Sequence, residues 1–325
     1  MMSGYRIAQT HEPEKMEMRE MYTQTLIALA EKNPDIMLLD ADLMGCNNTK
    51  KFAARYPDRI VNCGIQEANM IGVAAGLAIT GKIPFAHSFA VFATRRAYDQ
   101  VFVSAAYAGL NVKIIGSDPG ITAALNGGTH MPFEDMGIMR NIPTMMVLEP
   151  TDTVMLKSVL RQMADYKGVQ YMRLVRKNAV SIYEEGSEFE LGRAVRVKDG
   201  TDVTLIASGW CVAEALKACR ALEALGISAR LLDMFTWKPL DDEAVLAAAK
   251  ETGAIVTAEN HNVINGLGSA VAETLVRNLP VPVEMIGVQD SFGEVGPVSY
   301  LAERFHLTER DIVEAAKKAV ARKKG

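Results

Sequence analysis

The chain has 325 residues, of which 49% are hydrophobic and 23% charged, a composition typical of globular proteins with room for two domains. Its formal net charge of −4 provides no basic field for a nucleic-acid backbone or an anionic membrane, which argues against both partners. No apolar run reaches the roughly 18 residues that a membrane span needs, and residues 1–20 contain no apolar signal segment. Four widely spaced cysteines without a C-x-x-C pair fit a reducing compartment, so a soluble cytoplasmic protein is expected.

The first half of the chain alternates short apolar runs with longer helical patterns. The predicted strands are 36–39, 59–62, 83–87, 112–115, 144–148 and 170–175, and the predicted helices lie near 14–32, 47–56, 66–80, 90–109 and 152–166. Repeated strand and helix alternation predicts a mostly parallel sheet that is covered by helices on both faces.

A polar, acidic stretch at 181–202 interrupts this pattern and indicates a domain boundary with an edge hairpin. A second alternation follows, with strands predicted at 203–208, 229–235, 254–259 and 283–288 and helices near 210–225, 240–252, 267–277 and 308–323. The fold class expected is α/β, with two consecutive three-layer α/β/α domains at 1–188 and 189–325.

One carboxylate stands out in the stretch NCGIQEANMIGVAAGLAI (62–79). From Ala68 to Ile79 the residues are small and apolar, with Gly72 and Gly76 four apart, which predicts a helix packed on all sides. Glu67 stands at the start of this helix. A carboxylate there is exposed, is paired, or is kept because its proton is used.

Several other signals are weak. NGLGSA (265–270) is half of a dinucleotide-binding pattern but lacks the third glycine, so it is interpreted as a tight turn. The five histidines have no metal-ligand spacing, and no metal site is expected in this chain. Two segments remain: HSFAVFATRRAYDQV (87–101), with two phenylalanines three apart, and the glycine-rich SDPGITAALNGGTH (117–130), which follows a strand where parallel sheets bind ligands.

Taken in order, these segments resemble the C-terminal half of a transketolase, which is a pyrimidine-binding domain followed by the transketolase C-terminal domain. The matching pieces are DADL, NCGIQEANMIGVAAGLA, HSFAVFATRRAYDQV, GGTHMPFEDMGIMRNIP, EPTD, MRLVRKNA, AENH with NGLGSAVAE, and FGEVGP. The resemblance spans nearly the whole chain and is especially close to the second subunit of split transketolases.

The resemblance implies thiamine diphosphate as cofactor and a role in carbohydrate metabolism. Members of the family hold Mg²⁺ and the diphosphate through a GDG motif with a downstream asparagine, and this sequence has no GDG. It therefore implies a partner, an N-terminal transketolase subunit that carries GDG and Mg²⁺, in an α2β2 heterotetramer with active sites at the interface.

The family pattern implies a role for Glu67. Its carboxyl group would hydrogen-bond N1′ of the aminopyrimidine, so that the 4′-nitrogen can take the proton from C2 of the thiazolium. Burial among apolar residues would favour the protonated carboxyl group, and the helix start would oppose it. The other cofactor-binding residues implied are Gly64, Ile65, Phe89, Phe92, which stacks on the ring, and Arg95, which stands where many relatives have a third aromatic residue.

Substrate contacts are implied in the same way. His130 is expected near the reacting centre as a catalytic residue, and Asn126 stands where relatives read a sugar hydroxyl. Arg19 and Arg176 match arginines that grip a terminal phosphate. Two positions depart from the pattern: Asp118 replaces a histidine of the phosphate site, and Cys46 replaces a serine there.

The departures leave alternatives open. The ketose donor, a small sugar, ends either in a phosphate held by two arginines or in a different group, such as a sulfonate or a hydroxyl; Asp118 could instead merely pair with a neighbouring arginine. A 1-deoxyxylulose-phosphate synthase-like chain, a 2-oxoacid dehydrogenase β chain and a catalytically silent interaction subunit remain alternative functions. Glu259, His261 and Glu294 are expected to be structural.

Overall fold

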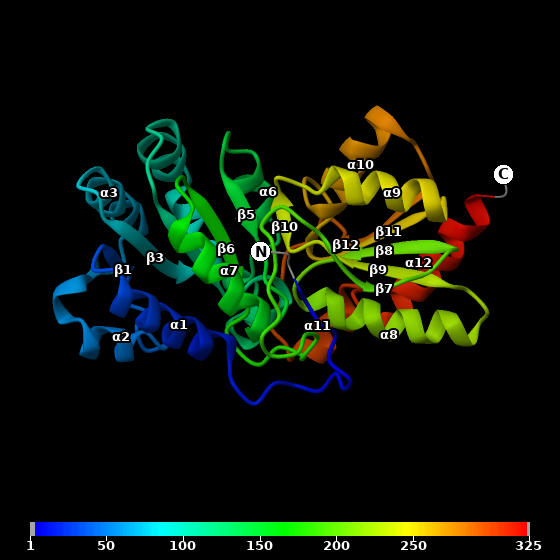
Figure 1. Cartoon of the computed structure of the whole chain (residues 1–325), viewed down its shortest axis with the longest axis horizontal. Coiled ribbons are helices and arrows are strands. Elements are labelled where there is room, and N and C mark those ends of the chain that lie inside the picture. The colour runs from blue at the N-terminus through cyan, green and yellow to red at the C-terminus, as the bar shows by residue number, and fades with distance from the viewer. Residues whose placement is uncertain (1–3, 324–325) are drawn as a thin grey trace.

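The structure, a computed structural model, describes residues 4–323; the outermost residues of the two predicted domain ranges lie outside this part. Two sheets lie side by side along the long axis of the molecule, each with helices on both faces (Figure 1). The predicted fold class is confirmed: both halves of the chain are α/β units with mostly parallel sheets.

The first sheet has seven strands in the order β10-β5-β6-β4-β3-β1-β2. All neighbours pair in parallel except β10, which comes from the second half of the chain and pairs antiparallel with β5. This strand was not predicted, because three residues are too few to show a period. The strands are β1 (Ile36–Asp40), β2 (Ile60–Asn62), β3 (Ile83–Phe89), β4 (Lys113–Ser117), β5 (Met146–Leu148), β6 (Gln170–Leu174) and β10 (Thr236–Lys238).

The helices around this sheet follow the predicted pattern with two departures: the short helix at 135–140 was not predicted, and one predicted helix is broken. They are α1 (Met18–Lys32), α2 (Lys50–Arg55), α3 (Glu67–Ile79), α4 (Ala90–Ala93), α5 (Tyr98–Gln100), α6 (Asp135–Arg140) and α7 (Thr153–Asp165). The single helix expected at 90–109 is instead broken: α4 ends at Ala93, a 3₁₀ turn spans Arg95–Ala97, and a π-helix spans Val101–Tyr107. The break occurs at Thr94, whose ψ of −80° is not helical.

The second sheet has five strands in the order β12-β11-β8-β9-β7. The predicted edge hairpin is wrong: the 181–202 stretch contributes one strand, β7, which pairs antiparallel with β9. The elements of this half are β7 (Val195–Lys198), β8 (Val203–Ala207), α8 (Trp210–Ala224), β9 (Ala229–Asp233), α9 (Asp242–Thr252), β11 (Ile255–Asn262), α10 (Leu267–Asn278), β12 (Val283–Val288), α11 (Val298–Arg304) and α12 (Glu309–Arg322).

The apolar core continues from one sheet to the other. Buried side chains of α1 and α7 belong to the same cluster as those of α8 and α12, which places these four helices on one side of the two sheets. Helices α3, α6, α9 and α10 belong to the cluster on the opposite side. The two α/β units are therefore packed together through a shared core.

The first sheet gathers the candidate residues at one edge. Strands β1, β2, β3, β4 and β6 run parallel, so their carboxyl ends meet at the same edge. The segments that follow these ends carry, in strand order, Cys46, Gly64 to Glu67, Phe89 to Arg95, Asp118 to His130, and Arg176.

Candidate active site

Glu67 is the first residue of α3, and it is 1% exposed. The Ser88 hydroxyl donates to Oε1 at 3.0 Å, and Arg96 Nη1 donates to Oε2 at 2.7 Å. Both carboxylate oxygens therefore have partners. The surroundings of the Glu67 carboxylate were predicted to be apolar, and this prediction was wrong. Arg96 lies beside the carboxylate, and its guanidinium compensates a buried negative charge.

The same guanidinium lies on an aromatic ring. The Arg96 guanidinium carbon is 3.9 Å from the centroid of the Phe92 ring, and the Phe89 ring lies 6.2 Å from Phe92 at an interplanar angle of 30°. Arg95, the arginine predicted to belong to the site, pairs with Glu134 at 3.1 Å and is exposed. Sequence reasoning missed Arg96, although its spacing of four from Phe92 was an available signal.

These contacts define a slot with a specific chemistry. A planar group that donates a hydrogen bond is held between the Glu67 carboxylate and the face of Phe92, and here that group is the Arg96 guanidinium. An aminopyrimidine ring has the same two properties, a flat face and a nitrogen that can share a proton with a carboxyl group. The residues present thus fit the pyrimidine end of thiamine diphosphate once Arg96 moves aside.

His130, one of the predicted substrate-binding residues, packs against the two phenylalanines beside Glu67. Its ring centroid is 5.2 Å from that of Phe92 and 6.3 Å from that of Phe89, with edge-to-face geometry in both cases. The Thr129 hydroxyl lies 2.8 Å from His130 Nδ1 and so fixes one ring nitrogen in a hydrogen bond. Gly64 and Ile65 form the turn before α3, where Ile65 is 70% exposed and free to meet a further molecule.

Asp118 and Arg176 form an ion pair at the predicted substrate end. Arg176 Nε lies 3.0 Å from Asp118 Oδ1, but within residues 4–323 neither this nitrogen nor Asp118 Oδ2 has a hydrogen-bond partner. Burial raises the pKa of the Asp118 carboxyl to about 6, and the charges of Arg176, Arg19 and Lys177 oppose this rise. A buried carboxyl group with an unsatisfied oxygen costs free energy unless a ligand supplies a donor.

Arg19 has an acidic partner as well. Its Nε donates to Glu17 at 2.6 Å, and its Nη1 donates to the backbone carbonyl oxygen of Cys46 at 2.7 Å. Cys46 therefore contacts the arginine through its main chain. Both arginines that the family pattern assigns to a terminal phosphate are thus already matched by a carboxylate of this chain.

The substrate loop, defined as residues 117–130, opens onto a cavity of about 550 Å³. Asn126 and Arg176 line one side of it, and Trp210 and Pro297 from the second α/β unit line the other. Two of the predicted substrate residues, Asn126 and Arg176, therefore face a hollow shared by both units of the chain.

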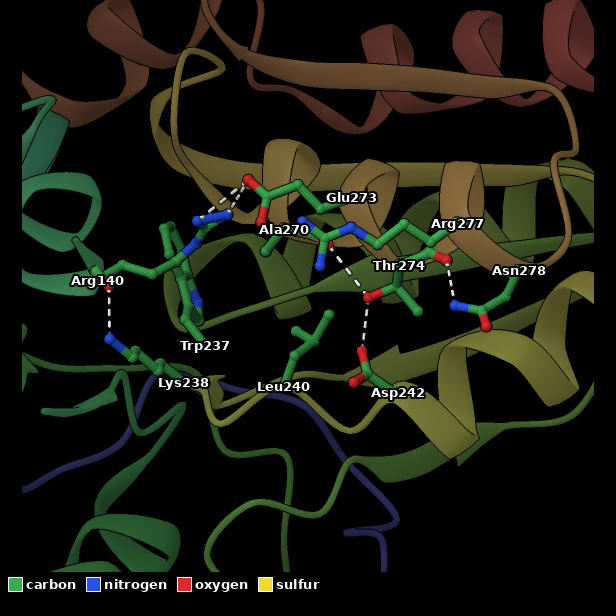
Figure 2. Close-up of a pocket in the computed structure, with 10 residues that line it drawn as sticks. All are labelled: Arg140, Trp237, Lys238, Leu240, Asp242, Ala270, Glu273, Thr274, Arg277 and Asn278. Carbon is green, nitrogen blue, oxygen red and sulfur yellow. Dashed lines mark hydrogen bonds and ion pairs between the residues drawn. The ribbon is translucent and has the colours of Figure 1, made fainter. Parts of the chain in front are cut away.

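A smaller hollow of about 340 Å³ between α6, β10 and α10 holds none of the predicted residues (Figure 2). Glu273 reaches across it to Arg140, whose Nη2 is 2.6 Å away, and the Thr274 hydroxyl donates to Asp242 at 2.5 Å. Lys238 donates to the backbone carbonyl of Arg140 at 2.9 Å. Arg140 and Glu273 pair across the junction of the two units, which gives the hollow a structural role.

Residues 4–323 contain neither a metal-binding cluster nor a membrane-spanning helix. No cluster of three or more His, Cys, Asp or Glu side chains is placed to hold a metal ion there. None of the helices in that range is long and apolar enough to cross a membrane.

A buried glutamate lies beside two phenylalanines at the carboxyl edge of a parallel sheet, an arrangement that suits a pyrimidine ring. Family models agree: the transketolase pyrimidine-binding domain matches residues 14–180, and the transketolase C-terminal domain matches residues 192–312. The chain belongs to the transketolase family.

Two relatives and one solved structure illustrate the similarity. The chain is 54% identical to the 6-deoxy-6-sulfo-D-fructose transketolase subunit SqwH of Clostridium sp. (strain MSTE9), over 94% of this chain and 95% of that one. It is 40% identical to a subunit of the apulose-4-phosphate transketolase of Phocaeicola vulgatus, over 84% of this chain and 87% of that one. A structure described as a split gene transketolase, inactive beta4 tetramer, superposes with a TM-score of 0.88 at 43% identity and covers 95% of this chain and 100% of that one.

Proposed function

We propose that this chain is the C-terminal subunit of a split, thiamine diphosphate-dependent transketolase that transfers a two-carbon ketol unit from a ketose to an aldose. The slot between Glu67 and Phe92, which already holds a planar hydrogen-bond donor, carries this proposal. The match of both family domains and the 54% identity to a transketolase subunit support it.

When bound, thiamine diphosphate supplies a carbanion at C2 of its thiazolium ring. This chain's residues bind and orient the pyrimidine ring of the cofactor. Glu67, oriented by the Ser88 hydroxyl, shares a proton with the pyrimidine nitrogen N1′, and the buried position of the carboxyl group keeps water from competing for that proton. Phe92 and Phe89 hold the ring flat, and His130, packed on both, donates to or accepts from the sugar hydroxyls.

A partner subunit would complete the site. Because the sequence has no GDG motif, the diphosphate and Mg²⁺ are assigned to a second chain, in an α2β2 heterotetramer. The exposed face of α3 supports an association there. Gly72, Gly76 and Ile79 were expected to pack on all sides, but in the single chain they are exposed, and a Cβ atom added at either glycine would meet no neighbouring atom within 4 Å. An apolar, small-residue face beside Glu67 suits close approach by another chain.

The donor is proposed to carry a singly charged terminus, of which a sulfonate is the strongest candidate. Arg176 pairs with Asp118 and Arg19 pairs with Glu17, so little positive charge remains for a phosphate dianion. A sulfonate carries one negative charge at all relevant pH values, and the relative with 54% identity is named for a sulfonated ketose. The unsatisfied Asp118 oxygen would accept a hydrogen bond from a donor hydroxyl next to that terminus.

The test is to mix the chain with a GDG-bearing partner, thiamine diphosphate and Mg²⁺, and to compare kcat/KM for matched ketoses that end in sulfonate, phosphate or hydroxyl. We expect transfer only in the mixture and the highest kcat/KM for the sulfonate. Absence of transfer from every ketose, with a complex that assembles, would point to the silent interaction subunit instead. A strong preference for the phosphate would reject the sulfonate assignment alone.

A further inference from the structure

We propose that Asn260, in the second α/β unit, is a positioning residue that sets the substrate loop and thereby the selection of the donor terminus. This inference rests on the proposed function, because it concerns the same cavity. The family pattern placed no functional residue in this unit, and Asn260 was not singled out from the sequence.

Asn260 holds the substrate loop at two points. It lies near the end of β11 and is fully buried. Its Oδ1 accepts a hydrogen bond from the Ile121 backbone N–H at 2.8 Å, and its Nδ2 donates to the Pro119 carbonyl oxygen at 3.2 Å. One side chain therefore bridges the two sides of Gly120. Asparagine alone offers an acceptor and a donor at this length, since aspartate lacks the donor and leucine lacks both.

Asn260 is itself fixed in place. Arg173 Nη1 donates to the Asn260 backbone carbonyl at 2.8 Å. This arginine is fully buried and pairs with Asp135 at 2.8 Å and with Glu149 at 3.1 Å. A buried network with satisfied partners is rigid, so the loop is attached to a stable part of the molecule.

The loop also approaches the second unit too closely for ordinary side chains. Gly120 has φ +49°, and a Cβ atom there would lie 2.1 Å from Asn260 Oδ1. A Cβ atom at Gly128 would lie 2.1 Å from the Gly293 carbonyl oxygen. Glycine at these two positions allows the backbone to touch the second unit near both ends of the loop.

The position of these contacts predicts that they control where the Asp118 carboxyl group lies relative to Arg176. Asp118 directly precedes Pro119, has φ +57°, and faces Arg176. A shift of the turn around Gly120 would therefore move the Asp118 carboxyl group relative to Arg176. Glu67 belongs to α3 and takes its hydrogen bonds from Ser88 and Arg96, so it is not coupled directly to this turn.

Two variants test the proposal in the assembled complex. Asn260→Ser shortens the side chain that bridges the turn, and Gly120→Ala disrupts the same bridge from the loop side, because its Cβ would press on the Asn260 side chain and backbone carbonyl. Asn265→Gly is the matched control: it removes a hydrogen bond of 2.8 Å from an asparagine of the same unit to the Gly137 carbonyl, outside the substrate loop, and glycine tolerates its φ of +60°.

The readout is the ratio of kcat/KM for a sulfonate-ended ketose to kcat/KM for a four-carbon ketose without an anionic terminus. Loss of the bridge should lower this ratio about tenfold in both variants, mainly through KM of the sulfonate donor, and leave it unchanged in Asn265→Gly. An unchanged ratio in Gly120→Ala would overturn the inference and leave the proposed function standing. A wild-type complex with no ketol transfer would contradict both the inference and the proposed function.

Discussion

Arg96 Nη1 lies 2.7 Å from Glu67 Oε2, and the guanidinium of the same side chain covers the Phe92 ring at 3.9 Å. The arginine therefore satisfies the two groups that the pyrimidine ring would use. Under the proposed function, binding of thiamine diphosphate would break this ion pair, whose arginine side chain is 44% exposed and can turn toward solvent.

Replacement of Arg96 should lower the stability of the chain but raise the affinity of the complex for thiamine diphosphate. In Arg96→Ala the buried Glu67 carboxylate loses one partner, so the free energy of unfolding of the isolated chain should fall by about 1–3 kcal/mol. In the complex the same variant should bind thiamine diphosphate several-fold more tightly, because no internal ion pair competes. Urea unfolding of the chain and titration of the complex measure the two effects.

Arg95→Ala is the control for stability. Its ion pair with Glu134 is between two partly exposed side chains, so the free energy of unfolding should change by less than about 1 kcal/mol. Equal stability of the Arg95 and Arg96 variants would contradict the importance of the pair with Glu67.

Asp118 predicts a pH dependence of donor binding. Burial raises its pKa to about 6, so below that pH the carboxyl group becomes neutral and Arg176 is left to the donor terminus. For a sulfonate-ended ketose, which does not titrate in this range, KM should fall as the pH is lowered from 7 toward 5.5. Asp118→Asn should remove this dependence; a profile that is the same in both proteins would exclude Asp118 as its source.

The Asp118 carboxyl group also makes the free energy of unfolding depend on pH. Because its pKa in the folded chain is above the ordinary value of 3.8, the folded state holds the proton more tightly than the unfolded state. Its contribution to the free energy of unfolding is therefore fully present below pH 3.8 and is lost as the pH rises through about 6. Urea titrations across this window should show a smaller decline in stability for Asp118→Asn than for the wild type.

Exchange of Asp118 for the histidine of the family pattern should shift donor preference. Asp118→His removes the negative charge beside Arg176, so kcat/KM for a phosphate-ended ketose should rise about tenfold relative to the sulfonate. Steady-state kinetics with the matched pair of donors measures this ratio. A ratio that stays constant would show that Asp118 does not set the charge at this end of the site.

Arg173 should be among the most sensitive positions for stability. Its replacement by methionine leaves Asp135 and Glu149 buried without their cation, which should cost about 3–5 kcal/mol in the free energy of unfolding. Arg55→Met, which breaks an exposed pair with Glu31, should cost less than about 1 kcal/mol. A similar loss for both variants, measured by urea unfolding, would contradict the role assigned to the buried network.

Much of the fold could be predicted because buried parallel strands leave strong apolar runs. The runs ending near Asp40, Asn62 and Phe89 are strands in the structure, and their common direction explains why distant motifs meet at one edge. The helix predicted at 90–109 is broken at Thr94, and the apolar period of the sequence does not mark this change in backbone conformation. The domain boundary after residue 188 and the roles of individual site residues stay predictions.

Arg96 and Asn260 were missed in the sequence for the same physical reason. Arg96 and Asn260 act through contacts with residues 29 and more than 130 positions away, and periodicity does not report such contacts. Arg95 was assigned because it stands where relatives carry a third aromatic residue, and that pattern gave no role to the neighbouring Arg96. Asn260 was not singled out, because its partners Pro119 and Ile121 lie in a distant segment of the chain.

The most direct test of the central claim is ketol transfer by the chain mixed with its GDG-bearing partner, thiamine diphosphate and Mg²⁺, with wild-type Glu67 and with Glu67→Gln. Glu273→Gln, in the hollow of Figure 2, serves as the control. We expect transfer only in the mixture, normal turnover in Glu273→Gln, and a loss of about 100-fold or more in Glu67→Gln with assembly retained. Near-normal turnover in Glu67→Gln, or full activity from this chain alone, would contradict the account.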